Sequence, residues 1–208
     1  MSVVTEPFPH MVVDDAWDPD LLARVLAEFP ADDDPRLRRF GNAEERKLEG
    51  GPEFWGPATH EMFAGIESLI PSLERAFGIP GLSMELVGGG YHVIPVGGYL
   101  AVHTDFNRSP VTGLHRRLNL LVYLNEDWKA DDGGQLELWD DEGPSVRIDP
   151  EFNRTAVFAT SDRSWHGHPE PTKRVRRSVA AYFYSREEPE GYAGEHSTVW
   201  HPRGAVRA

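Results

Sequence analysis

Two kinds of metal-binding side chain stand at a short spacing in the middle of the chain. His103 and Asp105 are two residues apart, at the end of the apolar run 99–102. On a β-strand such side chains project from the same face, so one ion can contact both. A further histidine, His166, follows the apolar run 156–159. Two imidazoles and one carboxylate form the facial triad that holds non-haem Fe(II) and leaves coordination positions open.

Other interpretations of these histidines stay open. A His-x-Asp tripeptide arises often by chance, and the histidines of 166–168 also suit an exposed turn. His168 competes with His166 as the third ligand, because it lies two residues further on and shares the same strand face. We favour His166, partly because of its spacing to the next candidate, Arg176.

Arg176 and Ser178 form a candidate carboxylate-binding pair. They open the run 176–184, where their spacing places them on one strand face while Arg177 points away. A guanidinium binds a carboxylate through two parallel hydrogen bonds, and a hydroxyl can add a third. This combination suits the distal carboxylate of 2-oxoglutarate in a buried pocket. The alternative is that these arginines belong to a solvated strand edge.

Strands must position these residues, and the sequence after Gly78 has the pattern of an antiparallel sheet. Short runs of β-branched and aromatic residues alternate there with Gly-Gly, Asp-Gly and proline-containing turns. We expect strands near residues 84–94, 99–105, 117–125, 134–139, 145–148, 154–160, 164–168 and 175–185. Eight short strands indicate a sandwich or jelly roll.

Residues 117–125 show which face of this sheet is covered. Alternation places the side chains of one face together, namely Leu118, Leu120, Val122 and Leu124, and those of the other, Asn119, Leu121 and Tyr123. The apolar face needs a cover, and two amphipathic helices are expected at 19–29 and 59–77. Pro71 should kink or split the second helix. The face with Asn119 and Tyr123 then looks into the sandwich, where polar groups need partners or a ligand.

The segment 32–55 lies between the two expected helices. It is polar and rich in glycine and proline, and it is long for a connection within a compact domain. Such segments are often lids or binding loops, and we expect this one to be a lid.

Composition limits the classes of function. The length of 208 residues suits a single domain, and the absence of cysteine excludes disulfides, thiolate metal sites and a cysteine nucleophile. A net charge of -13 opposes binding to nucleic acid or to anionic membranes. Residues 1–11 lack the pattern of a signal peptide and no long apolar run follows, so a cytoplasmic location is expected.

Taken together, these motifs resemble the prolyl-4-hydroxylase-like branch of the Fe(II)- and 2-oxoglutarate-dependent dioxygenases. The resemblance covers about residues 84–185. It rests on several ordered motifs, which are Tyr91 ahead of Gly97-Gly98-Tyr99, His103-Thr104-Asp105, Arg116-Arg117-Leu118-Asn119, Tyr123-Leu124-Asn125-Glu126-Asp127-Trp128, Gly133-Gly134, and His166 followed by Arg176-Arg177-Ser178.

The resemblance implies a double-stranded β-helix, which is a jelly-roll or cupin-like barrel, mainly β with covering helices (α+β). The whole chain, 1–208, would be one oxygenase domain. Residues 1–80 would form the helical cover with the lid 32–55, residues 84–185 the core, and residues 186–208 a C-terminal tail.

The resemblance also assigns roles to the candidate residues. Fe(II) would be bound by His103, Asp105 and His166, and the distal carboxylate of 2-oxoglutarate by Arg176 with Ser178. The phenols of Tyr123 and Tyr91 would hydrogen-bond the co-substrate, and its pocket would be lined by Asn119 and Leu136. Each tyrosine is equally suited to be a core aromatic with a satisfied hydroxyl.

The implied reaction uses O2, releases succinate and CO2, and usually hydroxylates an unactivated C–H bond, with ascorbate as a candidate reductant. Because Asp105 supplies a carboxylate ligand, halogenation is not expected. The substrate would be a small molecule, an amino acid or a peptidyl proline. The segments 33–35, 42–47 and 119–125 resemble bacterial relatives of enzymes that hydroxylate a proline in a ribosomal protein. Substrate would enter near Asn107, Arg116, Trp139 and Trp165, and the lid would close over it.

Three rival functions remain at this stage. One is a cupin-like metal-binding barrel, an isomerase or hydrolase, since the same ligands bind other divalent metals; the Arg176-x-Ser178 pair argues against it. A second is a non-catalytic barrel that binds a small ligand through its tryptophans and tyrosines. A third, a nucleic-acid demethylase, conflicts with the negative charge. The sequence does not indicate the oligomeric state.

Overall fold

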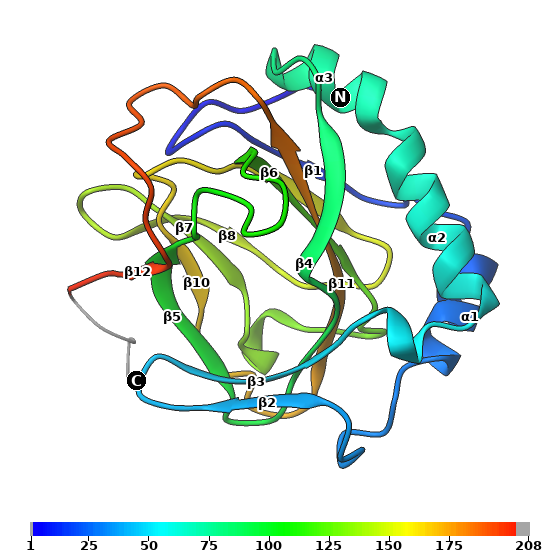
Figure 1. Ribbon diagram of the computed structural model, residues 1–208. Coiled ribbons are helices and arrows are strands. Elements are labelled where there is room, and N and C mark those ends of the chain that lie inside the picture. Colours follow the sequence, from blue (N-terminus) through cyan, green and yellow to red (C-terminus); the bar gives the residue numbers. More distant parts are fainter. Residues whose placement is uncertain (1, 203–208) are drawn as a thin grey trace.

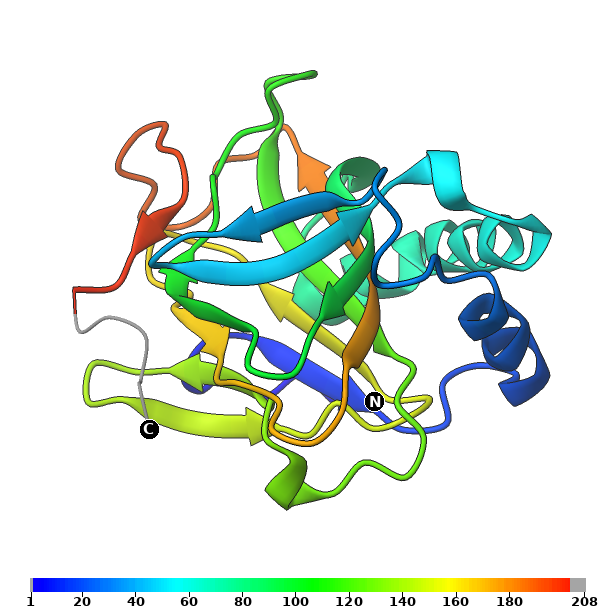
Figure 2. The same cartoon turned by 90° about the horizontal axis from the view of Figure 1, so that it is seen from below.

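The main feature of the structure, a computed structural model that describes residues 2–202, is one antiparallel sheet that curls on itself. Three helices lie along one side of the curled sheet (Figures 1 and 2). Among the described residues, no helix is long and apolar enough to cross a membrane.

Twelve strands make up this sheet. They are β1 (His10–Val13), β2 (Arg38–Gly41), β3 (Glu45–Gly50), β4 (Ser83–Ile94), β5 (Tyr99–Thr104), β6 (His115–Tyr123), β7 (Leu136–Trp139), β8 (Pro144–Ile148), β9 (Thr155–Ala159), β10 (His166–His168), β11 (Arg176–Ser185) and β12 (Val199–Trp200). Their order in space is β1-β9-β6-β11-β4-β3-β5-β10-β7-β8, with β2 paired to β3 and β12 paired to β5. All eight strands expected from the sequence are present.

The helices are α1 (Pro19–Ala27), α2 (Pro57–Ser68) and α3 (Ile70–Phe77), and Pro52–Phe54 and Ala130–Asp132 form single 3₁₀ turns. The side chain of Asp18 accepts a hydrogen bond from the Asp20 amide at the start of α1, as an N-cap does. The expected split at Pro71 is confirmed, because α2 ends at Ser68 and α3 begins at Ile70.

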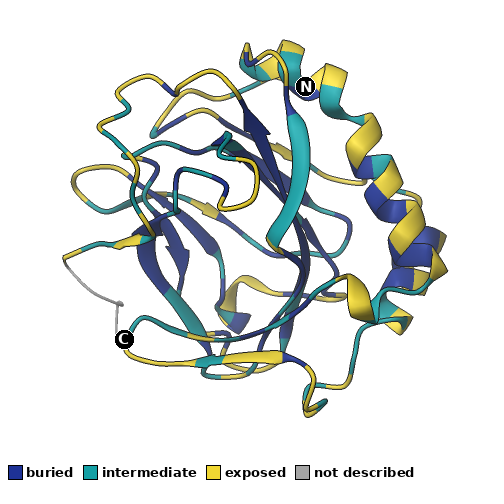
Figure 3. Ribbon diagram, in the orientation of Figure 1, coloured by how far each residue is buried: buried dark blue, intermediate teal, exposed yellow. Residues whose placement is uncertain are grey.

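The main core lies between the helices and the apolar face of β6. Leu118, Leu120 and Val122 are fully buried there, together with Met62 and Ile66 of α2. The inner faces of the helices are buried and their outer faces are exposed (Figure 3). The alternation expected for residues 117–125 is therefore confirmed, and the opposite face of β6 looks into the curl of the sheet.

Residues 32–55 do not form an irregular loop, because β2 and β3 occupy 38–41 and 45–50, and closure of this segment over substrate stays a prediction. β3 lies within the sheet, where it pairs with both β4 and β5. Its inward side chains are charged: the Lys47 ammonium lies 3.2 Å from a Glu45 carboxylate oxygen and 2.8 Å from one of Glu49. These opposite charges compensate one another inside the wall, so the strand lacks the apolar pattern by which strands are recognised.

The expected C-terminal tail, 186–208, also contains sheet structure. β12 pairs with β5, with Trp200 opposite His103, and the His201 amide donates to the Val102 carbonyl at 2.8 Å. This brings the last described residues against the strand that carries the metal-binding candidates. Residues 203–208 of the tail lie outside the described residues.

Candidate metal centre and adjoining cavity

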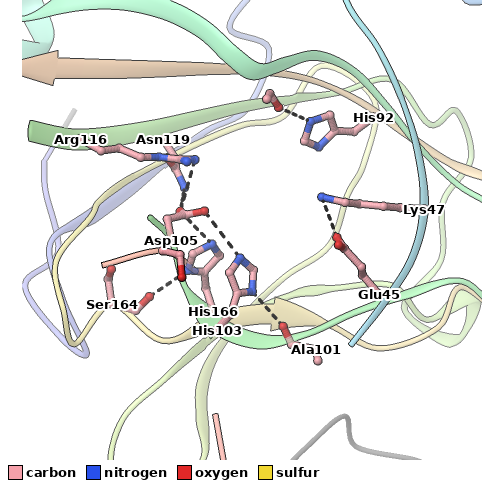
Figure 4. Close-up of polar contacts among 12 residues, drawn as sticks. Glu45, Lys47, His92, Ala101, His103, Asp105, Arg116, Asn119, Ser164 and His166 are labelled. Carbon is pink, nitrogen blue, oxygen red and sulfur yellow. Dashed lines mark hydrogen bonds and ion pairs between the residues drawn. The ribbon is translucent and has the colours of Figure 1, made fainter. Parts of the chain in front are cut away.

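His103, Asp105 and His166 come together at one end of the curled sheet (Figure 4). His103 on β5 stands directly opposite His166 on β10 in the strand pairing, and Asp105 follows the end of β5. The Nε2 atoms of the two histidines lie 3.7 and 3.5 Å from the Asp105 carboxylate oxygens. One potential ligand atom from each residue lies within 4.8 Å of the others, so a single ion can contact all three.

The hydrogen bonds of the two imidazoles fit metal binding. Nδ1 of His103 lies 2.8 Å from the Ala101 carbonyl, and Nδ1 of His166 lies 2.8 Å from the Ser164 carbonyl. Because a carbonyl only accepts, each Nδ1 carries a proton, and each Nε2 faces Asp105. Burial, with the neighbouring His103, lowers the pKa of His166 to about 4, which keeps this ring neutral at pH 7. The donor set therefore fits a divalent metal.

Asp105 is ionised in this setting despite its burial. Burial opposes the charge, but the Arg116 guanidinium and the two imidazoles outweigh that effect and hold the pKa of Asp105 well below its usual range. An Arg116 terminal nitrogen lies 3.3 Å from Oδ2 of Asp105, and the Asn119 amide donates to the same oxygen at 2.8 Å. The centre thus supplies a carboxylate and two imidazoles.

A buried cavity adjoins the triad, and Arg176 projects into it. Arg176 is 3% exposed; its Nε donates to the Gly134 carbonyl at 2.9 Å and a terminal nitrogen lies 3.4 Å from the Tyr123 hydroxyl. Gly134 has φ +66°, a backbone conformation that favours glycine. Among residues 2–202 the guanidinium has no carboxylate partner. A buried cation without an anion is costly, so the cavity suits an anionic ligand.

Ser178 strengthens this interpretation of the cavity. Its side chain is fully buried beside Arg176, and its hydroxyl has no hydrogen-bond partner among the described residues. Leu136 contributes an apolar wall, as expected. Tyr123 is also fully buried, and burial raises its pKa even though Arg176 opposes the rise, so the phenol stays protonated; its oxygen accepts a hydrogen bond from Arg176. Four of the six expected co-substrate residues therefore line the cavity, namely Arg176, Ser178, Leu136 and Asn119, and a fifth, Tyr123, contacts Arg176.

Tyr91 does not face this cavity, so its expected contact with the co-substrate is wrong. On β4 the side chains that line the cavity are those of His92 and Ile94, and strand alternation turns Tyr91 to the opposite face. There it packs in the helical core, 4.1 Å from the Phe29 ring between centroids, and its hydroxyl bonds to Thr59 of α2. Tyr91 is therefore a core aromatic with a satisfied hydroxyl, which was the alternative role considered for it.

Asn119 lines the cavity as expected, but its side chain is engaged with Asp105 and Arg116 rather than with the Arg176 end. His168 also lines the cavity, yet it lies outside the cluster of three ligand residues, and its Nδ1 lies 3.1 Å from the Pro169 carbonyl. The preference for His166 over His168 therefore agrees with the geometry.

One of the four expected substrate residues lines the cavity beside the triad, and the other three do not. Arg116 lines both the cavity and an outer vestibule beside the triad. Asn107 is buried, and its amide binds Asp162 and the Gly194 carbonyl, which connects two loops. Trp139 is buried with its indole nitrogen on Glu137. Like Trp165, neither residue is part of the vestibule wall, so a substrate contact of these three residues stays a prediction without support from the cavity geometry.

The vestibule is about 360 Å³ in volume, and its aromatic walls were not anticipated. They come from Phe40 of β2, Phe106, Tyr182 of β11 and Trp200 of β12. The Trp200 ring lies 5.1 Å from that of His103 between centroids. Lys47 and Glu45 face the triad from across the space (Figure 4). Phe40 and Trp200 lie in β2 and β12, which were not predicted as strands because the segments around them are mainly polar.

Comparisons with known proteins agree with this geometry. The model of the 2OG-Fe(II) oxygenase superfamily matches residues 89–184. A prolyl 3,4-dihydroxylase of Ostreococcus tauri is 25% identical over an alignment 217 residues long, which covers 89% of this chain and 40% of that protein. The chain thus spans less than half the length of this relative.

Solved structures show the same fold. A prolyl-4-hydroxylase of Pseudomonas putida aligns with a TM-score of 0.66 and 20% identity, over 86% of this chain and 93% of that one. A prolyl hydroxylase of Trichoplax adhaerens, solved with a peptide of the hypoxia inducible factor oxygen degradation domain, aligns with a TM-score of 0.63 and 22% identity, over 85% and 83%. The expected double-stranded β-helix is confirmed.

Proposed function

The chain belongs, through residues 89–184, to the 2OG-Fe(II) oxygenase superfamily, and from this we propose that it hydroxylates a prolyl residue of a peptide. The reaction would convert substrate, 2-oxoglutarate and O2 to hydroxylated substrate, succinate and CO2. The observation that carries the proposal is the placement of a metal-binding triad and a buried guanidinium, which has no carboxylate partner in the described part of the chain, around one cavity.

The metal would be held by His103, Asp105 and His166. When bound, Fe(II) with 2-oxoglutarate supplies the activation of O2 that couples decarboxylation to cleavage of a C–H bond. Each imidazole donates its Nδ1 proton to a backbone carbonyl, which presents Nε2 as the ligand atom.

The co-substrate would lie with its distal carboxylate at Arg176. The guanidinium would form charge-assisted hydrogen bonds to this carboxylate, and the Ser178 hydroxyl, which lacks a partner among the described residues, would add another. Tyr123 would orient the guanidinium and Leu136 would exclude water from the aliphatic part of the ligand. The same Arg-Ser pair argues against the cupin-like isomerase or hydrolase and against the non-catalytic barrel.

The substrate would occupy the aromatic vestibule. A pyrrolidine ring presents C–H bonds on both faces, and aromatic rings pack well against such surfaces. Phe40 and Trp200 belong to the walls beside the triad and would hold the ring while restricting water at the site. A peptidyl proline is proposed over a free amino acid because the similar proteins are named as prolyl hydroxylases, one of them solved with a peptide.

The experiment is a turnover assay on the reconstituted protein. Fe(II), 2-oxoglutarate, ascorbate and a library of proline-containing peptides would be supplied, with free proline in parallel, and succinate and a 16 Da mass gain would be measured. Succinate formation coupled to the mass gain on a prolyl peptide supports the proposal. Coupled turnover of free proline alone would reject the peptide substrate, and the His166→Ala variant should abolish both signals.

A further inference from the structure

The two oxygens of the Asp105 carboxylate have different surroundings. Oδ2 accepts a hydrogen bond from the Asn119 amide at 2.8 Å and lies 3.3 Å from an Arg116 terminal nitrogen. Oδ1 lies 3.7 Å from Nε2 of His103, and Oδ2 lies 3.5 Å from Nε2 of His166. Each carboxylate oxygen therefore faces one histidine, and Oδ2 is also engaged by the two donors (Figure 4).

The orientation of Asn119 is itself determined. Its side-chain carbonyl accepts a hydrogen bond from Nε of Arg116 at 2.9 Å, so its NH2 group must face Asp105. Arg116 is 2% exposed and cannot move freely. Its guanidinium carbon lies 3.7 Å from the centroid of the Tyr182 ring and 4.7 Å from that of Phe106. The planar guanidinium packs on two aromatic rings and so holds the Asn119 side chain in one orientation. Asn119 in turn holds the orientation of the Asp105 carboxylate.

We propose that Asn119 is a positioning residue for the metal-binding carboxylate, and that Arg116 acts through Asn119 by fixing its amide. The pair holds Oδ2 and thereby fixes the orientation in which the carboxylate faces the two histidines. This inference rests on the proposed metal site. Residues that orient metal ligands typically contribute 10-fold to 100-fold to metal affinity, and Asn119 meets the description because its donor group contacts a ligand directly.

The test is a titration of the apo-protein with Co(II), followed by its visible absorption, which reports both affinity and coordination number. Asn119→Leu keeps the volume and removes the donor, and we expect the dissociation constant to rise about 10-fold to 100-fold with a changed absorption band. Asn107→Leu is the matched control, because Asn107 is also a buried asparagine but binds only loop groups. That variant should stay within about threefold of the wild type. If Asn119→Leu does not fold, Asn119→Ala carries the same expectation, because it also removes the donor.

A double-mutant cycle tests the role of Arg116. In an Arg116→Met background the amide is no longer held, so the further change Asn119→Leu should alter the dissociation constant by less than about threefold. Unchanged affinity and spectrum in Asn119→Leu, or an equal effect of that change in both backgrounds, would overturn the inference. Failure of the wild type to bind Co(II) would instead reject the proposed metal site, so the two failures are distinguishable.

Discussion

Arg176→Met should weaken 2-oxoglutarate binding more than any other single change in the co-substrate cavity. The guanidinium is 3% exposed, and among residues 2–202 its polar contacts are the Gly134 carbonyl and the Tyr123 hydroxyl, the latter at a long 3.4 Å. Its remaining N–H groups are available to a carboxylate. Methionine keeps much of the apolar stem and removes the charge and every donor.

The size of the effect follows from these contacts. Two hydrogen bonds between charged groups contribute about 1.5–3 kcal/mol each. In the variant the ligand-free protein also lacks the two hydrogen bonds that now hold the Arg176 side chain, and this offsets part of the loss in binding free energy. A net loss of about 3 kcal/mol corresponds to an increase of roughly 100-fold in the dissociation constant.

Calorimetric titration of the Mn(II)-loaded protein with 2-oxoglutarate measures this constant without turnover. Arg177→Met is the control, because Arg177 neighbours Arg176 in sequence but pairs with Asp32 outside the cavity. The control should bind 2-oxoglutarate within about threefold of the wild type. A change of less than about threefold in Arg176→Met, with metal still bound, would refute the assignment of Arg176.

Three further changes have defined expected outcomes. Trp200→Ala should raise KM for the peptide about 10-fold, since it removes an aromatic wall of the vestibule, and leave 2-oxoglutarate affinity unchanged; equal losses in both would contradict a substrate role. The pKa of His166 is about 4 in the folded protein and 6.5 in the unfolded chain, so the free energy of unfolding of the apo-protein should fall by about 3 kcal/mol between pH 6.5 and pH 4. In denaturant unfolding, His166→Gln should lose less of this free energy over the same pH range. Leu118→Ala should lower the free energy of unfolding by about 3 kcal/mol, and a loss below 1 kcal/mol would contradict its place in the core.

The parts of the fold that could be predicted are those in which one physical signal dominates. In β6 every second residue from Leu118 is a large aliphatic, and Asn119 lies on the opposite face, so both its strand character and its covered face follow from period-two geometry. The triad was predictable because two of its ligands share one strand face and are therefore neighbours by local geometry alone. The position of His166 beside these two ligands does not follow from local geometry, because it depends on the pairing of β5 with β10.

The parts that could not be predicted depend on long-range compensation of charge. β3 presents Glu45, Lys47 and Glu49 inward, and their mutual ion pairs replace the apolar signal of a strand. The two-residue strand β12 forms only because β5 offers a pairing edge. Tyr91 shows a related limit: its face is set by the register of β4 against β11 and β3, which the sequence of β4 does not contain.

The most direct test of the central claim is an anaerobic titration of metal-free protein with Fe(II) and then 2-oxoglutarate, followed by visible absorption. The account predicts a metal-to-ligand charge-transfer band that saturates at one equivalent of each and is lost in Asp105→Ala. Folded, metal-loaded protein that shows no band on addition of 2-oxoglutarate would contradict the claim that this cavity binds the co-substrate at the metal.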